Sequence, residues 1–315
     1  MRSKLCLGSS LSLLVLIFIE VQAIDTTRCD SRIPQLNGHI FTPMFDATSP
    51  FINTSVRIGV GIAQTEEVEY FAIHLGEYEL LSLTGDVLFS DINVMYQQRV
   101  KDWLAMFAEY HFTARIGTEM SSLFVEGINT VHEFDVGWIL KAYHSEKHIL
   151  STYFSINNLN AKFIDFTNIL ESISGDTLIP ASRDVPALTG SVGLRYAWAP
   201  RSLIGIGLMA ELSYGEALSR STTKLFYKLG PKIDLDLSAK TRIPLGIALN
   251  YFITSAPAVV QDIEKRTQLL KLKFSYLGAG DFIIGFSTAW GKIPVNSSDE
   301  ILNAFFANLE MNYYF

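Results

Sequence analysis

Apolar and polar residues alternate along most of this chain, and the pattern is clearest at the C-terminal end. There, every second position is apolar, in the series Phe305, Ala307, Leu309, Met311, Tyr313 and Phe315. The positions between them include Asn308, Glu310 and Asn312. Because successive side chains of a β-strand point to opposite faces, this pattern predicts a strand with one apolar and one polar face.

The same alternation recurs in earlier segments and predicts about 12 strands in all. The segments cover residues 56–62, 88–96, 104–116, 134–142, 150–156, 188–198, 204–214, 225–237, 243–253, 270–276, 282–290 and 305–315. Their apolar faces contain no Asp, Glu, Lys or Arg. The polar faces carry Arg57, Glu109, Arg115, Glu133, Asp135, Lys141, Arg195, Glu211, Lys224, Lys228, Lys232, Asp234, Asp236, Lys271, Lys273 and Glu310. One face of each strand therefore excludes charge and the other accepts it.

Composition indicates what the apolar faces meet. The chain is 49% hydrophobic and 18% charged, with a mean hydropathy of +0.24, whereas soluble domains are about 25% charged. A soluble sandwich would carry a denser charged face, and no run of about 18 apolar residues follows Ala23 to form a spanning helix. We therefore predict an all-β fold, a closed antiparallel transmembrane barrel in which a charge facing lipid would cost about 2–4 kcal/mol. The net charge of −7 offers no basic surface for nucleic acid.

Residues 1–23 have the pattern of a cleaved signal peptide. Arg2 and Lys4 precede an apolar run over 11–19, and small residues before Ile24 suit a cleavage site. The mature chain would keep Cys29 as its one cysteine, which excludes a disulfide scaffold and a cysteine-based zinc site.

The remaining chain divides into residues 24–53 and a barrel over 54–315. Residues 24–53 could be a periplasmic lead-in or a segment inside the lumen. Residues 64–85 could form an external loop or two further strands, so a barrel of about 14 strands is the alternative.

Short and long links alternate along the chain. The short ones lie at 98–101, 145–147, 199–201, 239–241 and 278–281, and the long ones at 117–130, 157–187, 216–223, 255–264 and 292–302. Outer-membrane barrels have short periplasmic turns and longer external loops. We therefore expect the short links, and both ends of the barrel, on the periplasmic side.

The final segment, from Asn308 to Phe315, resembles the terminal strand of Gram-negative outer-membrane β-barrels, which alternates in the same way and ends in Phe. In those families the barrel-assembly machinery reads this strand. The resemblance therefore implies that Met311, Tyr313 and Phe315 form an assembly signal and that this machinery is a partner. The whole layout resembles porin and channel barrels of about 12 strands. That resemblance implies an outer-membrane location, contact with the lipid bilayer and passive passage of small solutes.

The charged faces allow two interpretations of the lumen. Their charges could line a narrow aqueous passage and tune its selectivity, or pair with one another and close it. Lys224, Lys228 and Lys232, with Lys271 and Lys273 two strands away, would form a basic stripe suited to anionic solutes. Alternatively these lysines pair with Asp234, Asp236 and Glu310. The sequence leaves both interpretations open.

The long link over 157–187, which is the third external loop when residues 64–85 count as the first, contains apolar residues at helical spacing, namely Leu159, Phe163, Phe166, Ile169, Leu170 and Ile173. They predict one short helix in the third external loop. The corresponding loop of general porins folds inward, and by that resemblance this one is a candidate gate. Alternatively, the helix packs across the rim without gating.

The sequence predicts no catalytic, metal-binding or cofactor-binding residue. The lipid-facing candidates for a hydrolase are Ser90, His132 and His148, and Ser90 lies two predicted strands from His132. That separation exceeds hydrogen-bond reach. The six histidines show no metal-ligand spacing. The main alternative to a channel is a structural or assembly-related barrel without transport, and a barrel hydrolase is less favoured.

Overall fold

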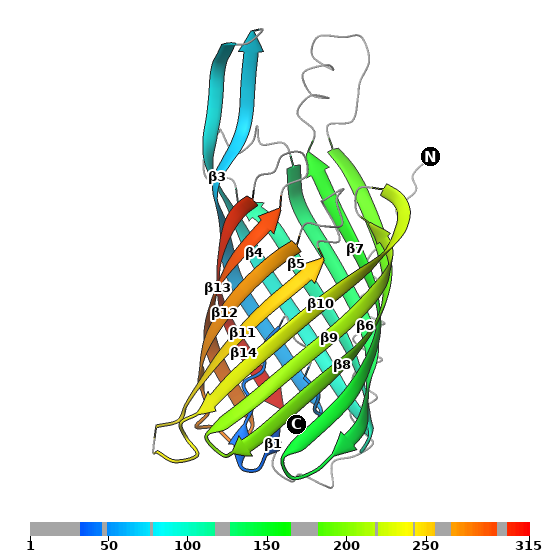
Figure 1. Cartoon of the computed structure of the whole chain (residues 1–315), viewed down its shortest axis with the longest axis vertical. Helices are drawn as coiled ribbons and strands as arrows, with labels where there is room; N and C mark the ends of the chain where they lie inside the picture. Colours follow the sequence, from blue (N-terminus) through cyan, green and yellow to red (C-terminus); the bar gives the residue numbers. More distant parts are fainter. Residues whose placement is uncertain are drawn as a thin grey trace, which may run out of the picture.

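A computed structural model describes residues 32–45, 49–75, 78–116, 127–164, 182–217, 220–241, 243–255, 266–294 and 301–315. Twelve antiparallel strands close into a barrel (Figure 1). They are β3 (Ser55–Leu75), β4 (Tyr78–Lys101), β5 (Leu104–Ile116), β6 (Gly127–His144), β7 (His148–Ile164), β8 (Ser182–Arg201), β9 (Ile204–Ala217), β10 (Arg220–Asp236), β11 (Leu245–Ser255), β12 (Arg266–Tyr276), β13 (Phe282–Pro294) and β14 (Ile301–Tyr314). Each strand pairs with the next in sequence, and β14 closes the barrel onto β3.

The predicted closed barrel of 12 strands is confirmed, and the alternative of 14 barrel strands is wrong. Residues 64–75 and 78–85 extend β3 and β4 and pair with each other rather than forming a separate hairpin in the wall. Figure 1 shows this pair rising above the other strands. The alternation breaks there because the pairing shifts register at several points along the extension.

The two faces of the wall differ as the alternation predicts. Outward side chains such as Val60 and Leu309 are 49% and 54% exposed, whereas inward Asp234 and Glu310 are fully buried. An exposed apolar surface that encircles the whole barrel marks contact with a membrane.

The expected helix in the third external loop is wrong where the structure describes it. Leu159 and Phe163 lie in β7 and pair with Ala187 and Arg183 of β8. Backbone pairing with β6 and β8 continues through both residues, and these hydrogen bonds outweigh the local helical spacing of apolar residues. Phe166, Ile169, Leu170 and Ile173 lie outside the described residues. No helix capable of crossing a membrane occurs in the described parts of the chain.

Residues 32–45 and 49–54 precede the first barrel strand and lie inside the barrel; we call them the plug. The plug contains a small hairpin of β1 (Gln35–Leu36) and β2 (His39–Ile40). Asn37 and Gly38 connect its strands with φ angles of 49° and 73°, as an Asn-Gly hairpin turn requires. Figure 1 shows β1 at the same end of the barrel as the C-terminus. This end has the short links, and we call it the periplasmic end.

Apolar side chains anchor the plug at two places. One cluster joins it to lumenal residues of β7 and β8 and contains Leu36, Phe41, Phe51, Ile149, Ala197 and Ala199. The other joins it to the last strands and contains Ile33, Leu277, Ile283 and Tyr314. Of the two placements that the sequence leaves open for this segment, the structure has the lumenal one for its described part.

Candidate functional site

Two buried carboxylates of β10 hold the backbone of the plug. Asp234 Oδ2 accepts a hydrogen bond from the Thr42 amide at 2.8 Å, and Asp236 Oδ2 accepts one from the Ile40 amide at 2.9 Å. Both aspartates are almost completely buried. A carboxylate that accepts from backbone N–H groups forms a strong, charge-assisted hydrogen bond, so these contacts fix the height of the plug in the lumen.

Three cations bind the carbonyl groups of the same segment. Lys232 Nζ donates to the Thr42 carbonyl and lies 2.7 Å from Asp234 Oδ2. Lys273 Nζ donates to the Pro43 carbonyl at 2.6 Å, and Arg57 Nη1 donates to the Met44 carbonyl at 2.6 Å. Because buried backbone polar groups need partners, lumenal charges here take the place that water would have in an open pore.

Neutral side chains secure the two ends of the plug. Asn37 Nδ2 donates to the Ala199 carbonyl at 3.1 Å, and Gln97 Nε2 donates to the Phe51 carbonyl at 2.9 Å. The His39 imidazole is buried, and this burial lowers its pKa below the usual value. A neutral ring is consistent with its Nδ1–H donating to the Ser202 carbonyl at 3.0 Å.

An ion network lies beside the plug in the lumen. Glu310 on β14 lies 2.6 Å from Lys273 Nζ and 3.2 Å from Lys271 Nζ, and all three side chains are buried. This network and the Lys232–Asp234 pair together place three of the five lysines of the proposed basic stripe in ion pairs. Lys228 instead lies over the Phe252 ring at 5.3 Å. For Lys232, Lys271 and Lys273, the structure favours pairing over a stripe of unpaired cations.

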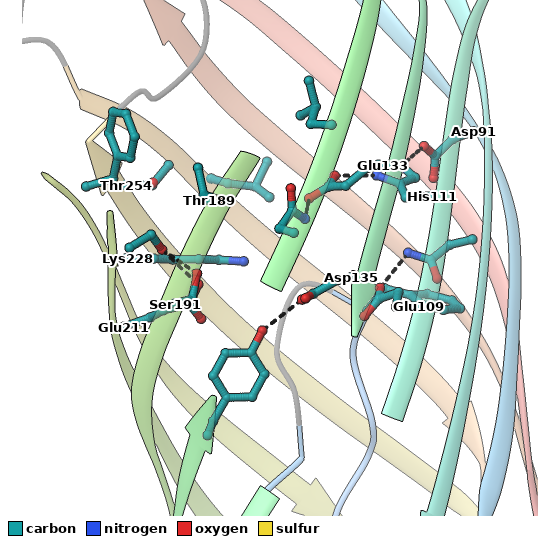
Figure 2. A pocket seen from close by; sticks show the side chains of 18 of the residues that line it. Asp91, Glu109, His111, Glu133, Asp135, Thr189, Ser191, Glu211, Lys228 and Thr254 are labelled. Carbon is teal, nitrogen blue, oxygen red and sulfur yellow. Dashed lines mark hydrogen bonds and ion pairs between the residues drawn. The ribbon is translucent and has the colours of Figure 1, made fainter. Parts of the chain in front are cut away.

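Beyond the plug, toward the external end, the lumen contains a cavity of about 480 Å³. Carboxylates of β4, β5 and β6 line one side of it, namely Asp91, Glu109, Glu133 and Asp135. Figure 2 shows Lys228 and Glu211 across the cavity from these acids. The cavity is therefore polarised, with most of its negative charge on the wall formed by β4 to β6.

Most of these acids have partners within the wall. His111 contacts both Asp91 and Glu133, the latter at 3.4 Å. Asn157 Nδ2 donates to Glu133 at 2.6 Å. Across the cavity, Arg195 Nη2 pairs with Glu211 at 2.6 Å. These contacts hold the side chains in place: Glu211 has its own cation in Arg195, whereas Asp91 and Glu133 share the one imidazole of His111.

The sixteen lumenal residues expected from the sequence separate into three groups. The cavity is lined by Glu109, Glu133, Asp135, Arg195, Glu211, Lys228 and Lys271. The plug and the ion network beside it involve Arg57, Lys232, Asp234, Asp236, Lys273 and Glu310. Arg115, Lys141 and Lys224 are half-buried and belong to neither group.

The lumenal residues expected from the sequence leave out several polar residues that line the cavity, among them Asp91, Asn93, His111, Tyr153 and Asn157. All of them occupy the inward parity of their strands, so the same alternation rule could have found them. Their mutual hydrogen bonds join different strands, and a linear sequence carries no signal for such pairings.

The C-terminal residues of the proposed assembly signal face outward. Met311 and Phe315 are 42% and 46% exposed, and the Tyr313 and Phe315 rings meet edge to face at 4.9 Å. The structure thus places all three side chains on the membrane side of β14, next to its end.

The three candidates for a lipid-facing hydrolase have other partners. Ser90 on β4 donates to the Ala114 carbonyl at 3.2 Å, while His132 on β6 bonds to the Tyr110 hydroxyl at 2.8 Å. Strand β5 separates the two, as the sequence predicts. His148 bonds to the Tyr196 hydroxyl at 2.7 Å. Within the described residues, no three His, Cys, Asp or Glu side chains come together as a metal site.

Comparison with known proteins finds similar folds only. No family model and no curated protein matches the chain. Similar solved structures include the NanC porin, with 8% identity and a TM-score of 0.48 over 83% of this chain and 100% of that one. The KdgM porin in complex with disordered oligogalacturonate has 8% identity and a TM-score of 0.45, over 82% and 99%. The translocator domain of autotransporter NalP from Neisseria meningitidis has 10% identity and a TM-score of 0.48, over 98% and 97%. The chain is therefore similar to these proteins in barrel architecture alone.

Proposed function

We propose that this chain is an outer-membrane β-barrel channel that passes small solutes through its lumen, with the plug as the element that closes it. The observation that carries the proposal is how the lumen is filled. Its periplasmic half is occupied by a separate segment, bound largely through backbone hydrogen bonds to charged side chains. Water can replace such contacts when the segment leaves, because hydrogen bonding exchanges with solvent at small net cost.

The wall leaves room for the plug. A Cβ atom added at Gly59 of β3 would lie 2.2 Å from the Phe45 ring, and one at Gly205 of β9 would lie 2.3 Å from His39 Nε2. The strands thus omit side chains where the plug sits, whereas a barrel filled by its own strands would place large residues there. Without the plug, these positions would widen the lumen.

The plug can move without opening the sheet. Its covalent connection to the barrel is at Ser55, where β3 begins, and β14 and β4 hold β3 by their own ladders. Withdrawal toward the periplasm would connect the cavity to that side. Since the charges that bind the plug are already on the wall, the opened passage would carry charged groups next to the apolar wall residues of the two anchors.

The second candidate is a structural or assembly-related barrel without transport. The buried ion network around Glu310 and the two apolar anchors of the plug favour it, because they stabilise the closed state. The two functions differ in one measurable property, the passage of ions after the plug is released.

Export and assembly belong to the same proposal. Residues 1–23, which lie outside the described part of the chain, would act as a cleaved signal peptide. Met311, Tyr313 and Phe315 would then address the barrel to the assembly machinery. We propose lipid, this machinery and small solutes as partners, and neither a catalytic activity nor a nucleic-acid partner.

A disulfide between plug and wall tests the gating role. A Cβ atom at Gly38 would lie 3.6 Å from the Cβ of Ser202, within the range of about 3.5–4.5 Å found in disulfides. In a Cys29→Ser background, we expect Gly38→Cys with Ser202→Cys to conduct at least about tenfold less in planar bilayers when oxidised than after reduction. The positive φ of Gly38 costs about 1–2 kcal/mol for cysteine, and this cost is common to both redox forms.

Release of the plug gives the complementary measurement. Asp234→Asn with Asp236→Asn weakens two hydrogen bonds to the plug and is expected to increase the frequency of current steps over wild type. Equal currents through the oxidised and reduced forms of the Gly38→Cys, Ser202→Cys variant would show that the plug does not gate the pore. If neither wild type, nor the reduced cysteine variant, nor Asp234→Asn with Asp236→Asn conducts ions, the structural barrel without transport would be favoured.

A further inference from the structure

We propose that the cavity contains a binding site for the ammonium group of a small organic solute, formed by Glu109, Asp135 and Asn93. This inference rests on the proposed function, since it names a class of solute for that lumen. The three residues lie on adjacent strands β5, β6 and β4 and line the same cavity. Figure 2 shows Glu109 and Asp135 close together below the Asp91–His111–Glu133 group.

Glu109 and Asp135 face each other directly. They are register partners in the ladder between β5 and β6, and both side chains point into the lumen. Like charges directly opposite each other on one face of a sheet are destabilising. Such a pair persists where something between or beside the carboxylates supplies positive charge.

No lysine or arginine of the described chain forms an ion pair with either carboxylate. Glu109 receives its hydrogen bond from Asn93 Nδ2 at 2.8 Å, and Asp135 receives one from the Tyr153 hydroxyl at 2.9 Å. Both donors are neutral. The neighbouring acids differ in this respect, because Glu211 pairs with Arg195, and Asp91 and Glu133 share His111.

Two buried acceptors at the same place have no donor within the described part of the chain. Asn93 is 7% exposed, and its Oδ1 atom has no hydrogen-bond partner; the same is true of Asp135 Oδ1. An unsatisfied buried acceptor is costly. The site therefore offers several oxygen acceptors and two carboxylates that no lysine or arginine of the described chain pairs with.

A primary ammonium group complements this arrangement. It carries one positive charge and three N–H donors, which matches acceptors on Asn93, Asp135 and Glu109. A calcium ion takes six to eight oxygen ligands, more than these three side chains supply while they also bind each other and Tyr153. The cavity of about 480 Å³ lies within the size range of small-molecule sites, so the rest of the solute has room above the plug.

Binding of 1,4-diaminobutane to the full-length barrel in detergent micelles tests the inference by isothermal titration calorimetry. We expect saturable binding to wild type, no saturation with the neutral 1,4-butanediol, and affinity lower by at least about tenfold in Asp135→Asn and in Glu109→Gln. Glu216→Gln is the matched control. It removes one carboxylate from the same cavity, at the exposed external end of β9, and is expected to change affinity by less than about twofold.

Each result is decisive. Equal weakening in Asp135→Asn and Glu216→Gln would indicate general attraction to an acidic lumen and would overturn the site. No binding to wild type at neutral and alkaline pH would mean that a shared proton satisfies the carboxyl pair, which also overturns it. The mobility of unheated protein on denaturing gels checks that every variant is folded. Because calorimetry needs no transport, binding without conductance would refute only the channel, and conductance without binding would refute only the ammonium site.

Discussion

Glu310→Gln is expected to lower the free energy of unfolding by about 3–5 kcal/mol, the cost of removing one partner from a buried ion pair. Glu310 is completely buried and contacts Lys273 Nζ at 2.6 Å and Lys271 Nζ at 3.2 Å, and Ser287 donates to it at 3.0 Å. A neutral amide would remove the carboxylate that pairs with the buried Lys273 ammonium group. Because Lys273 also holds the Pro43 carbonyl, the plug is expected to loosen with the network.

Urea-induced unfolding from lipid vesicles, followed by tryptophan fluorescence, measures this loss. Asp102→Asn is the control, since Arg99 and Asp102 form a pair with side chains 51% and 84% exposed, and exposed pairs contribute about 0–1 kcal/mol. Adding Lys273→Met to Glu310→Gln removes one uncompensated charge and should restore part of the stability. A Glu310→Gln cost no larger than that of Asp102→Asn would show that the network does not hold the lumen together.

Leu309→Lys is expected to destabilise the barrel in vesicles by about 2–4 kcal/mol, the cost of a cation facing lipid near mid-depth. Leu309 lies in the middle of β14, is 54% exposed on the outer face, and pairs with Val60 and Phe286 of the neighbouring strands. These neighbours are also outward and apolar, so a lysine there would have no polar partner within the wall.

Asn308→Lys provides the matched control one residue away. Asn308 has the opposite parity and lines the lumenal cavity, so a lysine there points into the cavity and not at lipid. Its expected effect is within about 0.5 kcal/mol, as for other substitutions at solvated positions. If the two variants lost equal stability in the same vesicle assay, the outer face of β14 would not be the lipid face, and the membrane barrel would be refuted.

The alternation of residue types predicted the wall of this barrel well. The twelve predicted segments correspond to β3 to β14, and charged residues such as Asp234 and Glu310 lie on the predicted inner face. This succeeded because each strand must match lipid on one side and a polar interior on the other, residue by residue. That constraint acts on neighbouring residues of one strand, so the alternation can be recognised from a short segment of sequence.

The local sequence pattern predicted the wrong secondary structure, or left it open, where pairing with distant parts of the chain determines it. Leu159 and Phe163 have helical spacing but continue β7, because ladder hydrogen bonds to β6 and β8 outweigh the spacing. The extensions of β3 and β4 around residues 64–85 were ambiguous for the same reason: their partner strand stabilises them across an irregular register.

The sequence by itself determined the barrel class and the inward or outward direction of the side chains in the clearly alternating segments, because both follow from a period-two pattern read along one strand. The choice between 12 and 14 strands came from the structure. The tertiary structure alone decided that residues 32–45 and 49–54 lie in the lumen, which lysines pair with a carboxylate, and that Glu109 and Asp135 face each other without an ion pair to a lysine or arginine of the described chain. The contact between Thr42 and Asp234 spans 192 residues, and that between Pro43 and Lys273 spans 230. Such contacts depend on closure of the barrel, which brings opposite walls and the N-terminal segment into one small volume.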